Sequence, residues 1–361
     1  MNRWRHRTSI KENKIIKTMT ETKQNRKIKI SDEKLLEYIK AGSSFEKTLY
    51  LDLGVKKIRL LCYSEEFIPH IKKQLTFVLR EKVSEYDATI VLWKEDDVEH
   101  VHENGQLFGD NTNIKHIIIT DTVATLMITN SETYFYGVRN LEPEEFVKEG
   151  HVFVKIFNKI LKTSKTALVH GACTGLDNKG VLMCARGQKG KSTLSVLSML
   201  EGFEYISDDY LTLESENNNL YAYPIYSIIT LSPKMYNELY DKLEGVRFVS
   251  NSARKDKYVL NIANMHNRFR MKYPVKFCLA LEFSKEETPS ITECTVKEKG
   301  NAITQMIHST VKQMQDLQEM QTIKKLLDMV SKFKFYKISL CSDIYKNVEL
   351  LRTFIREYKD D

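Results

Sequence analysis

Short apolar runs separated by polar residues follow one another along most of the chain, and their character changes near residue 150. Between residues 31 and 148 the runs have the length and composition of strands, with one amphipathic helical pattern near residues 66–83. This stretch predicts a small mixed α/β accessory domain with much antiparallel pairing. It contains no recognisable chemical motif.

The second part of the chain, residues 149–361, predicts a larger α/β domain with a mixed sheet flanked by helices. A helical period at 144–162 leads into the strand-like runs ALVHGA and GVLMCA, which are joined by a turn. Further strand-like runs (ITLS, YVLNI, KFCLALEF) precede a helical pattern at about 302–332, a strand and a terminal helix. Apolar residues recur at helical spacing along 303–330, and we expect this stripe to face the core.

Composition places the chain among folded globular proteins. Of its 361 residues 42% are hydrophobic, while 14 glycines and 6 prolines are too few for a fibrous or low-complexity protein. Six scattered cysteines without a C-x-x-C pair give no zinc site and fit a reducing compartment, so we expect a cytoplasmic protein. No apolar run approaches the ~18 residues of a membrane span.

The net charge of +7 is concentrated at the N-terminus. Residues 1–30 hold ten Lys/Arg and two Asp/Glu, which predicts a basic, disordered arm, either dispensable or able to hold an acidic peptide. The remaining chain is nearly neutral, so no nucleic-acid interface is expected. The sequence does not choose between a monomer and a homo-oligomer.

The most informative segment joins the strand ending at Ala185 to a helix beginning near Lys191. Backbone N–H groups of such a loop converge with a helix N-terminus on one spot, which suits phosphate. The lysine reaches the β- and γ-phosphates and the next hydroxyl can bind Mg²⁺. We therefore expect ATP, or another nucleoside triphosphate, with Mg²⁺. The candidate nucleotide-binding residues are Gly187, Gln188, Lys189, Gly190, Lys191, Ser192 and Thr193.

An acidic pair completes this candidate site. A helix from Lys191 to about Glu201 carries the chain ~16 Å away, and five extended residues return it by a similar distance. Asp208 and Asp209 are therefore expected beside the phosphates. Adjacent carboxylates at the end of an apolar strand repel each other unless a cation or donors compensate, and Mg²⁺ is such a cation. A solvated turn or helix cap is the alternative.

Four elements resemble, in order and spacing, the kinase core of the HPr kinase/phosphorylase family, which belongs to the phosphoenolpyruvate-carboxykinase-like P-loop group. They are His170-Gly171, the GKS loop, Gly202 and the Asp-Asp pair. The strong resemblance covers about 45 residues. It implies that Lys191 holds the transferred phosphoryl group, and that Ser192 and Asp209 bind Mg²⁺. It further implies that Asp208 is the general base, with His170 near the phosphate or the base. A hydrogen-bonded structural histidine is the alternative for His170.

Departures from the family pattern narrow this resemblance. Ala185 and Gln188 replace glycines that the family usually has in the loop, and the family's downstream glycine-and-arginine signature is missing. The chain therefore resembles relatives that keep the kinase core under a different N-terminal domain, such as free-serine kinases and lasso-peptide kinases.

A polar stretch at 245–257 is a further candidate for phosphate contact, with a solvated loop as its alternative. Its basic residues are Arg247, Arg254, Lys255 and Lys257, of which Arg254 is the candidate nucleotide contact. Together these features predict a Mg-ATP-dependent kinase acting on a hydroxyl, above all serine in a peptide or protein. A nucleotide-binding regulatory module without transfer, and a free-serine or small-metabolite kinase, remain the alternatives.

Overall fold

The structure is a computed structural model of residues 1–361, and its contacts divide the chain into two compact units. One comprises 1–45 and 90–140, the other 46–89 and 141–361. The expected domain boundary at 148/149 assigns 46–89 to the N-terminal part, whereas the contacts group this segment with the C-terminal part. The structure describes residues 27–30, 47–62, 64–94, 105–109, 114–119, 123–128, 132–138, 142–143, 151–185, 187–243, 246–252, 257–314 and 319–359.

The first unit contains a sheet of mostly antiparallel strands. Consecutive strands pair in the order β6-β7-β8-β9, with β1 parallel to β6 and β5 beside β9. β-Branched and aromatic residues dominate β7 to β9, which favours extended structure. Most of the basic arm expected at 1–30 lies outside the described residues, although its last four residues form β1. The strands are β1 (Lys27–Ile30), β5 (Ala88–Lys94), β6 (Gly105–Gly109), β7 (Ile114–Ile119), β8 (Val123–Ile128) and β9 (Thr133–Val138).

Residues 46–89 form a hairpin and a short helix within the second unit. The amphipathic α3 ends at Leu75, well before the expected residue 83, because the chain turns and Leu79 pairs with Leu51 of β2. Thr76 donates its N–H to the Ser227 hydroxyl, and Phe77 stacks on Phe269. The segment is thus bonded directly to the C-terminal part of its unit. Its elements are β2 (Lys47–Asp52), β3 (Lys57–Cys62), η1 (Glu65–Phe67), α3 (Ile68–Leu75) and β4 (Leu79–Arg80).

A mixed sheet in the order β10-β14-β15-β19-β12-β11-β13 forms the centre of the second unit. β12, β19 and β21 run parallel, and the other pairings are antiparallel. The strands are β10 (Thr166–His170), β11 (Ala172–Leu176), β12 (Lys179–Cys184), β13 (Glu204–Ser207), β14 (Tyr210–Glu216), β15 (Asn219–Pro224), β19 (Tyr273–Phe283), β20 (Ser290–Glu293) and β21 (Lys334–Leu340).

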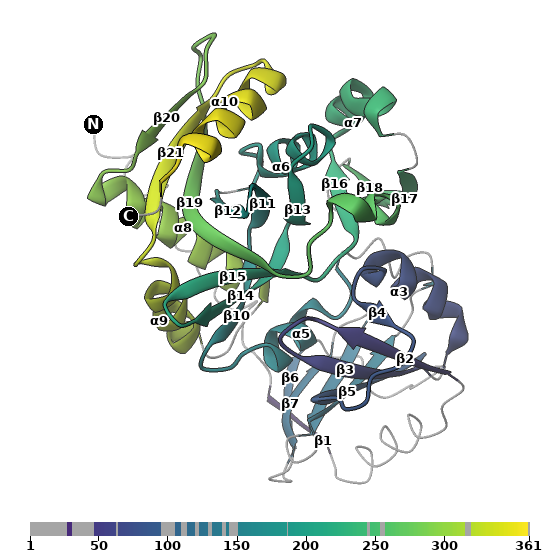
Figure 1. The fold of residues 1–361 in the computed structure, drawn as a ribbon. Coiled ribbons are helices and arrows are strands. Elements are labelled where there is room, and N and C mark those ends of the chain that lie inside the picture. The colour runs from purple at the N-terminus through teal and green to yellow at the C-terminus, as the bar shows by residue number, and fades with distance from the viewer. Residues whose placement is uncertain are drawn as a thin grey trace, which may run out of the picture. The chain divides into compact units, whose positions relative to one another are not determined.

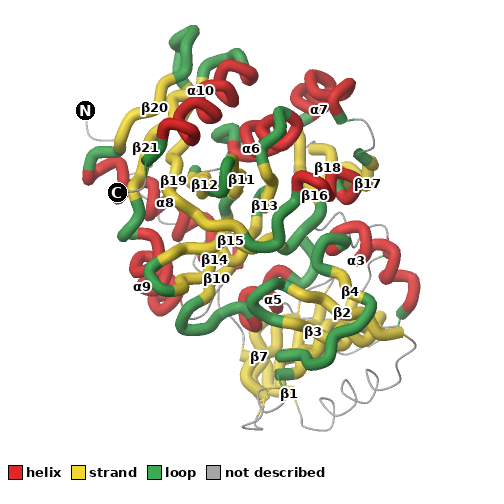
Figure 2. Tube along the Cα trace, in the orientation of Figure 1, coloured by secondary structure: helices red, strands yellow, loops and turns green. Residues whose placement is uncertain are grey.

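Helices cover both faces of this sheet (Figures 1 and 2). Side chains of α6 and α10 share one apolar core with the sheet, and those of α8 and α9 share the other. The expected mixed α/β fold with helices flanking a mixed sheet is therefore confirmed. None of the helices in the described residues is long and apolar enough to span a membrane. The helices are α5 (Val154–Ile160), α6 (Lys191–Leu200), α8 (Val296–Met314), α9 (Glu319–Val330) and α10 (Ile344–Glu357).

The helical pattern at 302–332 forms α8 and α9, with residues 315–318 outside the description. Its apolar stripe faces the sheet as expected at Ile303, Met306, Ile307 and Val330, which are buried, whereas Leu327 is exposed.

A second, smaller sheet in this unit has the order β16-β18-β17. The stretch 245–257, considered as a loop in the sequence, contains β17, which pairs antiparallel with β18. Its elements are β16 (Ile228–Leu231), α7 (Pro233–Leu239), η3 (Tyr240–Lys242), β17 (Arg247–Ser252), β18 (Lys257–Asn261) and η4 (Ala263–Arg268).

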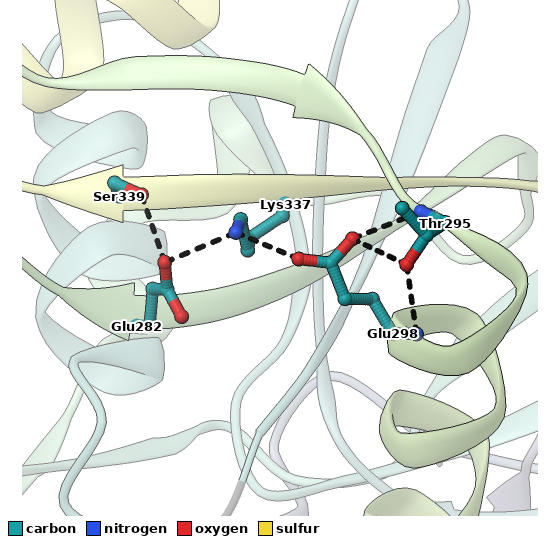
Figure 3. Close-up of polar contacts among 5 residues, drawn as sticks. All are labelled: Glu282, Thr295, Glu298, Lys337 and Ser339. Carbon is teal, nitrogen blue, oxygen red and sulfur yellow. Dashed lines mark hydrogen bonds and ion pairs between the residues drawn. The ribbon is translucent and has the colours of Figure 1, made fainter.

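The start of α8 is tied to β19 and β21 by a polar network (Figure 3). Thr295 and Glu298 form a reciprocal capping box: Glu298 N–H donates to the Thr295 hydroxyl, and Glu298 Oε2 accepts from Thr295 N–H at 2.9 Å. Lys337 Nζ lies 2.7 Å from Glu298 Oε1 and 3.4 Å from Glu282 Oε1. Ser339 donates its hydroxyl to Glu282 at 3.0 Å. One lysine therefore links two strands to the helix.

We expect Thr295→Ala to lower the free energy of unfolding by about 1 kcal/mol, the usual effect of losing an N-cap.

The Lys337 hydrogen bond and the Thr295 backbone lower the pKa of Glu298 from 4.5 to about 2. Because this folded-state pKa lies below the ordinary value, the stabilisation by Glu298 is complete above about pH 4.5 and is lost as the pH falls towards 2. Urea unfolding of wild type and Glu298→Gln should therefore differ at pH 6 and converge at low pH.

The exposed Glu287 provides the matched control, Glu287→Gln, which should not change the free energy of unfolding at pH 6. A difference between wild type and Glu298→Gln that stays constant from pH 6 to pH 3 would contradict the role given to Glu298.

Candidate functional site

The site is built on the strand–loop–helix unit formed by β12, residues 185–190 and α6. β12 is apolar and buried up to Cys184, and α6 begins directly after Gly190. Gly190 has φ +87°, and a Cβ there would lie 2.9 Å from Leu340 Cδ1. Only glycine fits both conditions without strain or displacement. The sequence thus sets the sharp entry that directs the first N–H groups of α6 towards the loop.

Residues 185 and 188 at the turn of this loop are not glycine. Gln188 has φ +65°, a left-handed conformation that costs a non-glycine residue roughly 1–2 kcal/mol. Its side chain is exposed, as is that of Lys189. Ala185 is buried, and its carbonyl accepts a hydrogen bond from Lys191. Gln188 therefore takes part in the turn at a cost in backbone strain. Ala185 follows the end of β12 and has no positive φ.

Lys191, the first residue of α6, is only 6% exposed. Its Nζ donates to the Ala185 carbonyl at 2.8 Å. Burial lowers the pKa of Lys191, while the charges of Asp209 and Asp208 act in the opposite direction. The ammonium group is thus held between the loop and the acidic pair.

Asp208 and Asp209 follow β13, which returns the chain from the far end of α6. Gly202 has φ +100° and ends the helix region, after which β13 runs from Glu204 to Ser207. The charges of both aspartates act on Lys191, and Asp208 interacts with the Ser192 hydroxyl. The structure therefore brings the acidic pair to the start of α6, where the helix and strand lengths place it.

Asp208 is 2% exposed, and no described group meets hydrogen-bond distance and angle to either of its carboxylate oxygens, although the Ser192 hydroxyl lies near enough to favour the ionised form. Burial, followed by the charge of Asp209, raises the pKa of Asp208 from 3.8 to about 7. The Ser192 hydroxyl and the charges of two lysines partly oppose this shift. A buried acid without partners is destabilising, and it suits a group that acts on a ligand.

Asp209 differs from its neighbour in backbone and in charge state. Its φ is +71°, a strained conformation that aspartate tolerates better than most residues. Its Oδ2 accepts from the Thr230 hydroxyl at 3.4 Å. Burial acts to raise the pKa of Asp209, but nearby cations outweigh it and hold that pKa below its usual range. The groups responsible are, in decreasing effect, His170, His151, Lys257 and Lys191, of which the histidines act only while they are protonated.

His170 ends β10 opposite Tyr210 and lies beside Asp209. The backbone N–H of His170 donates to the Thr310 hydroxyl oxygen at 3.0 Å. Its ring packs edge-on against the Tyr210 ring, with the ring centroids 5.3 Å apart. Burial lowers the pKa of the imidazole, and the Asp209 charge opposes this. The resemblance predicts His170 near the phosphate or the base, and in the structure His170 lies beside the acidic pair.

Two residues of this neighbourhood were missed in the sequence. His151 packs against the rings of Tyr210 and Tyr226 at 4.7 and 4.5 Å, and its charge acts on Asp209. Thr230, on β16, contacts Asp209 directly. Both approach from elements distant in sequence, and neither belongs to a spaced motif, so no local signal identifies them.

The basic stretch contributes Lys257, whose charge acts on Lys191, His170 and both aspartates. Arg254 and Lys255 lie outside the described residues, and only the backbone of Arg247 is described. The expected role of Arg254 in nucleotide binding therefore stays a prediction.

The residues present fit a magnesium ion held together with phosphates. No group of three or more His, Cys, Asp or Glu side chains able to hold a metal occurs in the described part of the chain. Mg²⁺ does not need such a group, because it commonly uses one or two carboxylates and completes its shell with phosphate oxygens and water. The unpartnered Asp208 oxygens, Asp209 and the Ser192 hydroxyl are oxygen donors of this kind.

We expect Asp208→Asn to stabilise the unliganded protein at neutral pH. Because the folded-state pKa of Asp208 exceeds 3.8, the folded protein binds more protons than the unfolded chain between about pH 4 and 7. The contribution of Asp208 to the free energy of unfolding should fall as the pH rises through this window. At pH 8 the free energy of unfolding of the variant should exceed that of wild type by at most a few kcal/mol, since each unit of pKa shift is worth ~1.4 kcal/mol. At pH 4 the difference should vanish.

Urea unfolding at both pH values checks this, with Asp241→Asn, at an exposed aspartate of η3, as the matched control. An equal effect of Asp208→Asn at pH 4 and pH 8 would show that Asp208 is not a buried ionisable group of this kind.

Comparison with known proteins adds little to this geometry. No family model matches the chain, and no curated protein matches it. Among solved structures, the chain is similar to the Hpr(Ser) kinase/phosphatase from Coxiella burnetii at 13% sequence identity and a TM-score of 0.30. The match covers 52% of this chain and 88% of that chain. A similarity this low carries no functional argument, so the interpretation of the site depends on its own residues.

Proposed function

We propose that the protein is a Mg-ATP-dependent kinase that transfers a phosphoryl group to a hydroxyl. The observation that carries this proposal is the convergence of an unpartnered, buried carboxyl group with a buried lysine at a strand–loop–helix junction. Backbone N–H groups at the start of α6 and the Lys191 ammonium suit a polyphosphate. The carboxyl group suits chemistry at the end of that polyphosphate.

Each residue has a distinct role in this proposal. Lys191 binds the phosphates, Ser192 and Asp209 hold Mg²⁺, and Asp208 accepts the proton of the acceptor hydroxyl. The acceptor oxygen forms a bond to the γ-phosphorus while the bond to the leaving oxygen of ADP breaks. Bound Mg²⁺ supplies positive charge that neutralises the phosphate oxygens. Lys257 and Lys191 support the anionic state of Asp209 at neutral pH, whereas burial favours the neutral form of the neighbouring His170.

The separation of the two aspartate pKa values supports this division of roles. Asp209 is held ionised, as a metal ligand must be, whereas the pKa of Asp208 is raised to about 7. A general base is most effective when its pKa lies near the working pH. Two adjacent carboxyl groups whose environments push their pKa values apart are typical of an acid–base site.

The buried Asp208 also favours a kinase over a regulatory nucleotide-binding module. A module that only binds needs the loop, Lys191 and one metal ligand. It has no use for a second carboxyl group that costs stability while it lacks a partner. A step in which Asp208 accepts a proton gives this carboxyl group a use.

We propose serine in a peptide or protein as the acceptor. The support is the kinase-core resemblance, the missing downstream glycine-and-arginine signature, and a basic arm and N-terminal part that a small-metabolite enzyme does not require. Free serine is the alternative acceptor, and the products distinguish the two.

The first test of this function is Lys191→Met, which keeps the buried aliphatic chain and removes the ammonium group. Wild type should be stabilised by Mg-ATP by about 2.7 kcal/mol at a hundredfold excess over Kd, seen as a rise of several degrees in Tm. The variant should lose most of this rise. Lys234→Ala, at an exposed lysine in the first turn of α7, is the control and should keep it. Equal Tm shifts in Lys191→Met and wild type would exclude the loop as the binding site.

The second test separates binding from transfer. Asp208→Asn should keep Mg-ATP binding but lower the rate of phosphoryl transfer to serine-containing peptides by about 100-fold or more, because a positioned base contributes that much. Asp209→Asn should weaken both binding and transfer. Mass spectrometry of the products reads the rate and locates the phosphate.

Wild-type turnover by Asp208→Asn would contradict the base assignment. Phosphoserine found only as the free amino acid would replace the peptide acceptor by free serine and leave the kinase proposal standing.

A further inference from the structure

A large aromatic side chain stands exposed beside the loop. Phe283, the last residue of β19, is 58% exposed. Its ring atom Cζ lies 3.4 Å from the position that a Cβ on Gly190 would occupy, so the ring borders the start of α6. In α/β sheets, ligands bind at the carboxyl ends of parallel strands. Phe283 lies at that end of β19, opposite Leu340 at the end of β21 and beyond Ala280, which pairs with Cys184 at the end of β12.

The ring continues a buried row of side chains on the α6 face of the sheet. Phe277, Leu279 and Leu281 alternate along β19, and all three lie in the apolar core shared with α6. Because side chains on a strand alternate with a period of two, Phe283 belongs to the same face. The row is buried until it reaches the loop, where its last member, Phe283, emerges from the core.

The position of Phe283 is fixed by the pairing of β19 with β21. Phe283 is opposite Leu340 of β21, and Ser284 N–H donates to the Leu340 carbonyl at 2.8 Å. One residue earlier, Glu282 is opposite Ser339 and bonded to it in the network of Figure 3. The strand therefore presents the ring on a rigid support.

Other exposed aromatic side chains have partners that account for them. Tyr86 stacks on Arg59 at 4.3 Å, Tyr345 lies under Lys242 at 4.6 Å, and Tyr240 packs against Tyr236. Within the described part of the chain, no aromatic ring or cation covers Phe283 in this way. Its exposed face is available to a flat apolar ligand.

We propose that Phe283 is the stacking platform for the base of the nucleotide. The inference rests on the proposed function, in which the loop and Lys191 hold the phosphates. A nucleoside triphosphate anchored there must extend its sugar and base beyond the loop, and the Phe283 ring offers a flat, rigidly supported surface next to it. Stacking on one ring tolerates any base, since every base has a π face.

The experiment compares two ligands that share the phosphates and differ in the base. Calorimetric titration with Mg-ATP and with magnesium tripolyphosphate is carried out on full-length wild type, Phe283→Ala and Phe283→Trp. Phe283→Ala should weaken ATP binding about tenfold, within the range of one base–aromatic stack, and leave tripolyphosphate binding within twofold of wild type. Phe283→Trp should keep ATP affinity, with tryptophan fluorescence quenched by ATP and not by tripolyphosphate.

Tyr240→Ala, at another exposed aromatic residue, is the matched control and should change neither affinity. Unchanged ATP affinity in Phe283→Ala overturns the proposal, and so does an equal loss for both ligands, which would mean that Phe283 only supports the loop. In both cases wild type still binds ATP, so the proposed function survives. Wild type that binds neither ligand refutes the proposed function and the platform together.

Discussion

A buried carboxyl group next to a half-buried one, both beside a buried lysine, is the constraint on which the site depends. Taking such charges out of water is costly unless they are paired or become neutral. The protein uses both solutions. Asp209 stays ionised among His170, His151, Lys257 and Lys191, whereas the raised pKa of Asp208 brings its neutral form into the physiological range. This asymmetry shifts the pKa values of two identical side chains in opposite directions.

The fold holds this arrangement through backbone geometry more than through side-chain bonds. The parallel strands β12, β19 and β21 end at one edge of the sheet, and α6 begins where β12 ends. β13 returns the chain to the same level, and strain at Asp209 and Gln188 is borne by the buried elements around them. Such strain is typical of sites whose geometry serves a ligand.

The sequence predicted those parts of the site that depend on local geometry. Helix rise and strand rise placed Asp208 beside Lys191, because both quantities are fixed over ten and five residues. His151 and Thr230 were not predictable, since they reach the acidic pair through long-range packing. For the same reason the sequence did not group residues 46–89 with the second unit, or show that the polar stretch before Lys257 contains a strand. The sequence predicted Phe283 only as a residue of a strand. Its exposure arises because β19 extends beyond the apolar core at its last residues.

We propose that the acidic pair is a cation and phosphate site in which Asp208 ionises when the ligand binds. The direct measurement is calorimetry of Mg-ATP binding at pH 7 in buffers of different ionisation enthalpy, which counts the protons released. A group with a pKa of about 7 is roughly half protonated at that pH, so wild type should release roughly half a proton more than Asp208→Asn. Equal proton release by the two proteins at comparable affinity would contradict the account.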